Sequence, residues 1–306
     1  MANRIFVSAV VALWLGSMSW LVVDRILPSF YSGHPPRVTA YNTGEVVAWR
    51  VKWDKVPVGW AGSVRLEGDM GTTELHNRVM MEELPLMDLA PFWMRKVMGN
   101  VGELSFDALT RIELDSLGNF SAFESRISLN DVPSVLNVQG RVKDVNLELQ
   151  VNSGNFTSST SVYMPNSKAL SEALFPGARL PLMYVGRSWR EEVYSPFYAP
   201  GDPVKVVQAE AVAMDSMEYQ GKIRSVVRVE YRTIVGSGVK KNAQLQAVSW
   251  VDQGGDVLRH DVFVGDAEMR FERLDKDEAA KIGAKLFERL SQQGAELTSP
   301  TETADD

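Results

Sequence analysis

The run Val47-Ala-Trp-Arg-Val-Lys-Trp53 decides the fold, together with the run Val58-Gly-Trp-Ala-Gly-Ser-Val-Arg-Leu66 that follows it after Lys55-Val-Pro57. In both runs, apolar residues alternate with small or charged ones. Successive side chains of a β-strand point to opposite faces, so a period of two predicts a strand, a turn and a second strand with one buried face. In this hairpin we expect Trp49, Trp53 and Trp60 to face the same interior.

The same alternation continues along the chain as far as Leu274. It returns in Phe106–Asp115, Phe120–Leu129, Leu147–Asn152, Val227–Arg232 and Ala267–Glu272. One polar side per strand is typical of an antiparallel sheet with one face in water. The chain is therefore predicted to be mainly β, with residues 45–274 forming a large curved antiparallel sheet, a half-barrel or a sandwich. A connection near residues 174–189, which contain Pro and Gly, would divide this region into two halves.

An almost unbroken apolar run, Ile5–Val23, precedes the β region and stops at Asp24. A helix rises about 1.5 Å per residue, so this run is about long enough to cross the hydrocarbon core of a bilayer. Residues 1–27 are therefore predicted to be a transmembrane signal anchor, and residues 28–44, with three prolines, a linker. A cleaved signal peptide is the alternative, but the long apolar core with Trp14 and Trp20 favours an anchor.

The orientation of this anchor is less strongly determined by charge. Arg4 lies on one side of the apolar run, and Arg25 and Arg37 lie on the other. The short N-terminal stub makes insertion with the N-terminus inside easier, which leaves the bulk of the chain on the extracytoplasmic, periplasmic side. Cleavage of the segment would instead release a secreted protein.

Two segments have helical patterns. Met87–Val97 is short and apolar, with Asp88 as its expected N-cap. Residues 275–292 begin with Asp275 and Glu278, which form a capping box, and carry an apolar stripe at helical spacing. The stripe, expected to lie on the sheet, consists of Ala279, Ile282, Leu286 and Leu290. Residues 293–306 form an acidic tail that is predicted to be disordered.

The composition argues against several chemistries. The chain has no cysteine, so it lacks a thiol nucleophile and a thiolate metal site, and its net charge of −7 gives no reason to expect nucleic acid as a partner. His34, His76 and His260 are far apart, so no metal site is predicted. Ser237 and Lys240 match a catalytic Ser-x-x-Lys spacing, but they lie in a glycine-rich stretch typical of a hairpin loop. We therefore expect a protein that is not an enzyme and has no cofactor.

Two motifs carry a resemblance to a known family. Trp49-Arg-Val-Lys-Trp53-Asp-Lys-Val-Pro-Val-Gly59-Trp60-Ala61 resembles the opening hairpin of the β-rich accessory domain that precedes some bacterial transglutaminase-like domains, and of related exported proteins of unknown function. Gly186-Arg-Ser-Trp189 and Gly255-Asp-Val-Leu-Arg259 are similar to later signatures of these domains. The resemblance implies a curved antiparallel sheet, somewhat similar to lipoprotein carriers. A catalytic transglutaminase domain needs a cysteine, so no catalytic residue is implied.

The aromatic residues give the candidate site. Trp49, Trp53 and Trp60, together with Phe92, Trp93 and Met94 from the short helix, would line an apolar groove for an acyl chain or another apolar ligand. A solid core is the alternative interpretation. The predicted function is a non-enzymatic, membrane-anchored, extracytoplasmic β-domain that binds an apolar ligand, such as a lipid, or an envelope partner protein. The alternatives are an interaction scaffold that acts by sheet-edge pairing and a hydrolase using Ser237, Lys240 and His260.

Overall fold

The structure is a computed structural model that describes residues 13–14, 16–20, 43–68, 71–84, 104–130, 132–154, 156–163, 179–194, 204–233, 244–264 and 267–298. Residues 13–14 and 16–20 are helical, and Leu13, Trp14, Met18 and Trp20 are exposed there. No helix within the described ranges combines the length and the apolar character needed to span a bilayer. The rest of the predicted anchor, Phe92, Trp93, Met94 and the whole predicted helix Met87–Val97 lie outside these ranges.

Fourteen strands form one antiparallel sheet. The first eight are β1 (Val46–Trp53), β2 (Val56–Glu67), β3 (Thr73–Leu84), β4 (Leu104–Leu114), β5 (Phe120–Leu129), β6 (Val132–Lys143), β7 (Asn146–Ser153) and β8 (Phe156–Tyr163). The other six are β9 (Ser188–Tyr194), β10 (Val204–Tyr219), β11 (Lys222–Thr233), β12 (Leu245–Asp252), β13 (Val257–Val264) and β14 (Ala267–Arg273). The prediction of a mainly β fold with a large antiparallel sheet is confirmed.

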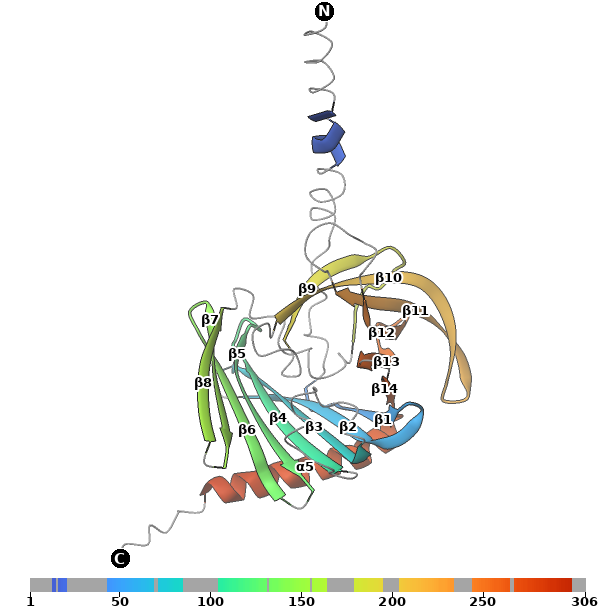
Figure 1. The fold of residues 1–306 in the computed structure, drawn as a ribbon. Helices are drawn as coiled ribbons and strands as arrows, with labels where there is room; N and C mark the ends of the chain where they lie inside the picture. Colours follow the sequence, from blue (N-terminus) through green and yellow to red (C-terminus); the bar gives the residue numbers. More distant parts are fainter. Residues whose placement is uncertain are drawn as a thin grey trace, which may run out of the picture.

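The order of the strands divides the sheet into two wings. β1 to β8 lie side by side in sequence order and end at the free edge of β8, while β9 begins at the opposite edge and the chain returns strand by strand to β14. β14 then pairs with β1, so the first and last strands meet inside the sheet. Figure 1 shows that the sheet curves into an open half-barrel, with β8 and β9 as its edges.

The hairpin of β1 and β2 corrects the expected position of Trp60. Asp54 and Lys55 have φ values of 45° and 75°, as a tight two-residue turn requires, and Trp53 pairs with Val56. A β-bulge then shifts the register by one residue, so that Trp49 lies opposite Ala61 and Trp60 lies opposite Arg50. A one-residue shift moves a side chain to the other face, so Trp60 does not share the interior with Trp49 and Trp53.

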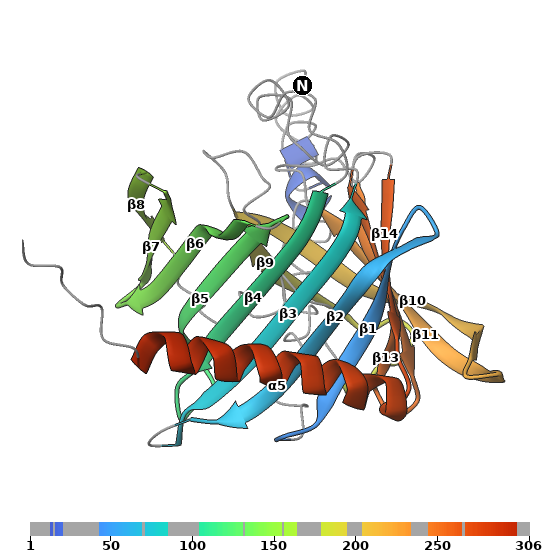
Figure 2. The same cartoon turned by 90° about the horizontal axis from the view of Figure 1, so that it is seen from below.

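Helix α5 (Lys276–Thr298) crosses the convex face of the sheet, over β1 and its neighbours (Figure 2). Asp275 caps it by accepting a hydrogen bond from the Glu278 amide at 2.8 Å. Its apolar stripe is buried on the sheet at Ala279, Ile282 and Leu286, against Ala48, Trp60 and Val64. The helix continues beyond the predicted end at residue 292, because Ala295, Glu296 and Leu297 favour helix and Gly294 alone does not end it.

Candidate functional site

The concave face of the sheet is an apolar wall. Apolar side chains from both wings form one cluster on this face, and many of them are fully buried. The cluster includes Trp49, Val51, Trp53, Met81, Ile112, Phe123, Leu147, Trp189, Val229, Val251 and Phe271. Phe123 lies directly over Gly140, where a Cβ atom would meet its ring at 2.1 Å. Other apolar residues, such as Val138, Tyr231 and Val262, contact the cluster but stay partly exposed.

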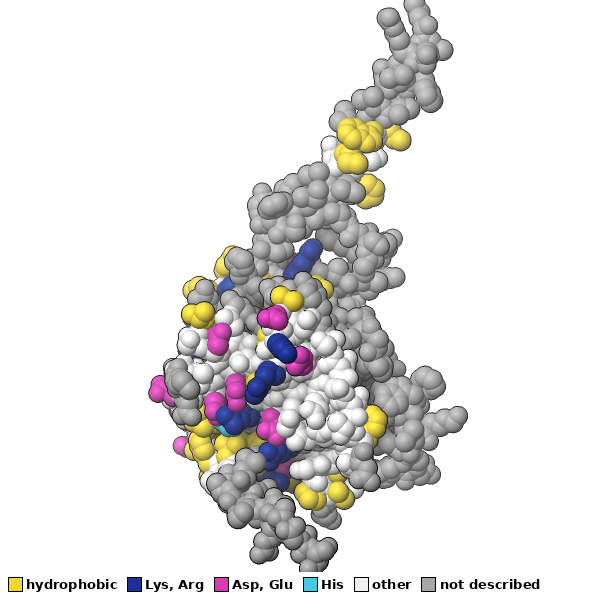
Figure 3. Space-filling model, turned by 90° about the vertical axis from the view of Figure 1, so that its left-hand side faces the viewer, with side chains coloured by type: hydrophobic (Ala, Val, Ile, Leu, Met, Phe, Trp, Pro, Cys, Tyr) yellow, Lys and Arg dark blue, Asp and Glu magenta, His cyan; other side chains and the backbone are white. Residues whose placement is uncertain are grey.

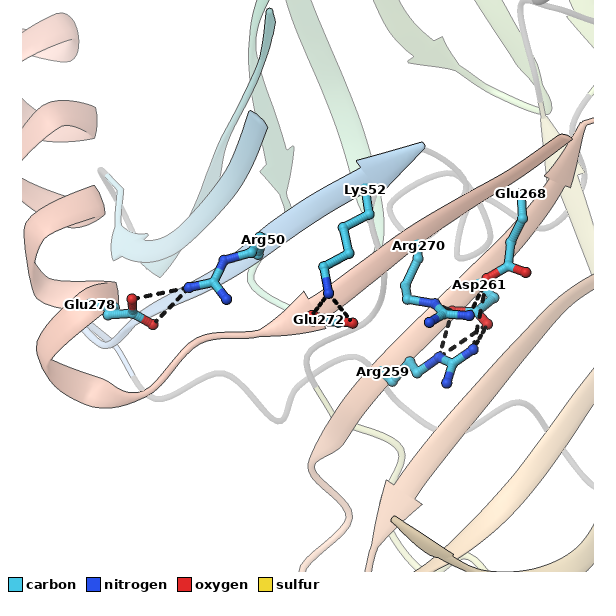
Figure 4. A network of polar contacts seen from close by, with 8 residues as sticks. All are labelled: Arg50, Lys52, Arg259, Asp261, Glu268, Arg270, Glu272 and Glu278. Atoms are coloured by element: carbon cyan, nitrogen blue, oxygen red, sulfur yellow. Dashed lines mark hydrogen bonds and ion pairs between the residues drawn. The ribbon is translucent and has the colours of Figure 1, made fainter. Parts of the chain in front are cut away.

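The convex face has the opposite character. Basic and acidic side chains lie next to one another on the side of the molecule that Figure 3 shows. Near the centre of the sheet, Asp261 is almost fully buried and binds the guanidinium groups of Arg259 and Arg270 (Figure 4). Arg259 also stacks on Trp250 at 4.3 Å from the ring centroid. These charges are paired laterally along the sheet, as expected for a face that meets water.

A row of polar residues crosses the apolar concave wall. The register places Ser63 opposite Asn77, Asn77 opposite Thr110, and Thr110 opposite Ser125, on four neighbouring strands. All four side chains are buried. Ser63 Oγ donates to Asn77 Oδ1 at 2.5 Å, and the hydroxyls of Thr110 and Ser125 are 2.9 Å apart. We call Ser63, Asn77, Thr110 and Ser125 the polar row.

Two neutral, buried N–H donors on this wall have no hydrogen-bond partner within the part of the chain that the structure describes. They are Asn77 Nδ2, in the middle of the polar row, and Trp49 Nε1, two strands away on the same face. Trp49 is 0% exposed and Asn77 is 1% exposed. Buried polar groups in native proteins nearly always have a hydrogen-bond partner, so these two donors require an explanation.

A second polar pair lies on the other wing of the wall. Ser249 and His260 face each other on β12 and β13, with Ser249 Oγ 2.7 Å from His260 Nδ1. The imidazole is surrounded by the rings of Tyr231 and Phe271. Burial lowers the pKa of His260 to about 4, so the ring is neutral near pH 7. Within the described residues no carboxylate contacts this imidazole.

Of the predicted groove residues, Trp49 and Trp53 lie on the concave wall. Trp60 instead lies beneath α5, where Arg78 and Lys285 stand over its ring. Ser237 and Lys240 lie outside the described ranges, and no cluster of metal-ligating side chains occurs within them. The sequence analysis missed the polar row. Its signal was a polar residue at an apolar position of the alternation in each of four strands.

Comparisons with known proteins leave the function open. No protein-family model matches the chain, and no curated protein matches it. Solved structures with some likeness include a β-barrel-like protein of a domain of unknown function from Brucella abortus, with a TM-score of 0.47 and 10% identity over 75% of this chain and 95% of that one. The hypothetical lipoprotein YmcC from Escherichia coli has a TM-score of 0.28 and 10% identity over 78% of this chain and 94% of that one. The transglutaminase-associated resemblance stays a prediction.

Proposed function

We propose that this protein is a membrane-tethered, extracytoplasmic binding protein, without catalytic activity, whose concave wall holds an apolar ligand with an acyl chain. The observation that supports this function is the separation of the two faces: apolar side chains from both wings line the concave face, and paired charges cover the convex face. Concave, mostly apolar surfaces with a few polar groups are typical of small-molecule sites.

Partly exposed residues of the wall give a ligand a place to enter. Val138 on β6, Tyr231 on β11 and Met269 on β14 contact the buried cluster yet keep part of their surface exposed. Apolar surface of this kind gains about 25 cal/mol per Å² when a ligand removes it from water. An acyl chain laid along these residues would extend the buried cluster.

In this proposal, the apolar N-terminal run is the segment that attaches the protein to the membrane. Leu13, Trp14, Met18 and Trp20 are exposed in the described part of that run, which leaves their side chains available to lipid. Trp residues are enriched at membrane interfaces. Carbonate extraction of membranes that contain the full chain should leave it in the pellet, and release into the supernatant would contradict the tether.

The ligand function is tested with full-length protein extracted from membranes in polymer-bounded lipid discs or detergent. The fluorescence of N-phenyl-1-naphthylamine, an apolar dye, should rise on binding, and organic extraction with mass spectrometry should recover a co-purified acyl compound. Absence of both would refute the proposal.

Two neighbouring residues provide a matched pair of variants. Val138 contacts the apolar cluster on the concave side, and Gln139, the next residue of β6, is exposed on the convex side. Val138→Asn should reduce dye uptake, because it places an amide in the wall, whereas Gln139→Asn should leave uptake unchanged. An equal loss of dye uptake in the two variants would exclude the concave face as the binding surface.

A second candidate function, association by edge pairing, is supported by β8. This edge strand is exposed from Phe156 to Ser161 and has neither a charge nor a proline, whereas the other edge strand, β9, contains Arg190, Glu191 and Glu192. Edge strands of soluble proteins usually carry such protective residues. In an antiparallel pair with a second copy, Phe156 would oppose Tyr163 and Ser158 would oppose Ser161, without repulsion between charges.

Edge pairing predicts a dimer that depends on β8. Ser159→Lys places a charge at the strand centre and should shift the protein from dimer to monomer in sedimentation experiments, while Gln150→Lys on the neighbouring β7 should not. A monomer at all concentrations in the unmodified chain would exclude this function.

A further inference from the structure

The two unpartnered donors on the concave wall point to the polar part of the ligand. This inference rests on the proposed function and deepens it. Trp49 lies opposite Ala61, and Ser63, two residues along on the same face of β2, lies opposite Asn77. Only the small residues Ala61 and Ser63 of β2 therefore stand between the two donors on this face.

The hydrogen bonds of the polar row fix what Asn77 can offer. Its Oδ1 atom already accepts the Ser63 hydroxyl proton, so its Nδ2 atom is left with protons to donate. An indole Nε1–H can only donate. The site thus presents donors alone and selects a ligand atom that accepts hydrogen bonds.

The charges near the two donors indicate whether the acceptor atom of the ligand is neutral or ionised. Arg273 lies opposite Trp49 on β14, and its guanidinium is engaged by Asp256 at 3.5 Å and by the Val257 carbonyl. Arg65 lies two residues beyond Ser63 on the same face of β2, and its guanidinium donates to Thr73 Oγ1 at 3.2 Å. Trp49 Nε1 and Asn77 Nδ2 are both neutral. Burial of a carboxylate beside neutral donors is costly, whereas a neutral carbonyl oxygen needs only hydrogen bonds.

We propose that Trp49 Nε1 and Asn77 Nδ2 bind the neutral carbonyl oxygen of an ester- or amide-linked acyl group. The acyl chain then lies on the apolar wall, and the two donors set its position. The site prefers an acyl ester or amide to the free fatty acid of the same chain length.

The test separates the carbonyl site from the apolar wall. Full-length protein is loaded with N-phenyl-1-naphthylamine, and methyl palmitate or palmitate at pH 7.5 displaces the dye. The unmodified protein should bind the ester at least several-fold more tightly than the acid. Phosphatidylglycerol and a palmitoyl amide serve as two further competitors, to distinguish a lipid ester from an amide-linked source.

The variants remove the donors while keeping the wall. Trp49→Phe keeps a ring but loses the N–H group, and Ser63→Ala with Asn77→Leu removes the second donor together with its internal partner. Each should weaken ester binding about 3- to 10-fold, as the loss of one hydrogen bond implies, and leave dye binding within twofold. Thermal unfolding of each variant confirms that it is folded.

Two matched controls complete the design. Trp250→Phe changes a tryptophan on the convex face, and Thr110→Val with Ser125→Ala removes a buried pair on the concave face whose hydroxyls already satisfy each other. Neither should alter the preference for the ester. Dye binding with no ester preference, or a preference that survives both donor variants, overturns the inference and leaves the proposed function standing. No dye binding at all refutes the proposed function.

Discussion

The two faces of one sheet handle polar groups in opposite ways. On the convex face, Asp261 holds two arginines, and Lys52 and Glu272 form an ion pair at 2.7 Å on the neighbouring strands. On the concave face the polar row is neutral, and its Asn77 Nδ2 has no partner among the described residues. Both faces come from the same strands. The period-two alternation therefore places charged side chains on the face that meets water, and only a few neutral polar side chains on the apolar face.

The largest effect is expected at Asp261. Asp261→Asn removes the charge that binds Arg259 and Arg270 at an almost fully buried position, and loss of one partner of a buried ion pair typically costs about 3–5 kcal/mol. Urea unfolding of the folded domain should report this loss. Glu272→Gln, which breaks the partly exposed pair with Lys52, should cost about 1 kcal/mol or less. Equal costs would mean that burial does not distinguish the two pairs.

The next effect is the response of the concave face to pH. The folded pKa of His260 is about 4, below its ordinary value of 6.5, because burial disfavours the imidazolium. A depressed histidine pKa favours folding above pH 6.5, and this contribution declines as the pH falls toward 4. The full loss, reached below pH 4, is roughly 3 kcal/mol, since one pKa unit corresponds to about 1.4 kcal/mol.

The pH response is isolated by comparing variants. The difference in unfolding free energy between pH 7 and pH 4.5 should be smaller in His260→Gln than in the unmodified chain. His76 on the convex face is a useful second site, because burial also lowers its pKa while the Glu74 carboxylate opposes that shift. An unchanged difference in His260→Gln would contradict the assignment.

A smaller effect is expected from added volume on the concave face. Gly140→Ala would push the buried ring of Phe123 and should cost about 1–3 kcal/mol, the usual range for overpacking. Combination with Phe123→Leu should recover part of the loss. Gly118 lies in a turn with a positive φ and has open space where a Cβ would be added, so Gly118→Ala reports backbone strain without this contact. A double variant that is no more stable than Gly140→Ala would show that the ring is not the obstacle.

The smallest effect belongs to the convex side at the start of α5. Asp275→Ala removes the N-cap and should destabilise the protein by about 1 kcal/mol, whereas Asp275→Asn keeps a capping oxygen and should be nearly neutral. Calorimetry can compare the two variants. An equal loss in both would indicate that the charge of Asp275, and not its cap, stabilises the helix.

The sequence predicted the strands better than the faces. Alternation placed Val47, Trp49, Val51 and Trp53 together correctly, because it depends only on the geometry of one strand. The side of Trp60 depends on a bulge that inserts Val58, and a one-residue shift leaves no clear sign in the alternation. The cap at Asp275 was predictable because it is local.

The candidate site was harder to predict than the fold. Trp49 and Trp53 were found as large aromatic residues, but the polar row needs the register of four strands, which brings Ser63 and Ser125 into one line. The strand order was equally hard to predict, since the pairing of β1 with β14 brings Lys52 next to Glu272, which is 220 positions away in the sequence. Such long-range pairing is decided by tertiary burial and not by local pattern.

The meeting of β1 and β14 inside the sheet has a consequence for how the chain acquires its structure. Each wing consists largely of hairpins between strands adjacent in sequence, which form quickly because little loop entropy is lost. The seam between them must wait for the last strand to be made, and α5, the next segment, then closes over it. A chain truncated before Ala267 would keep its hairpins but have no means of joining them.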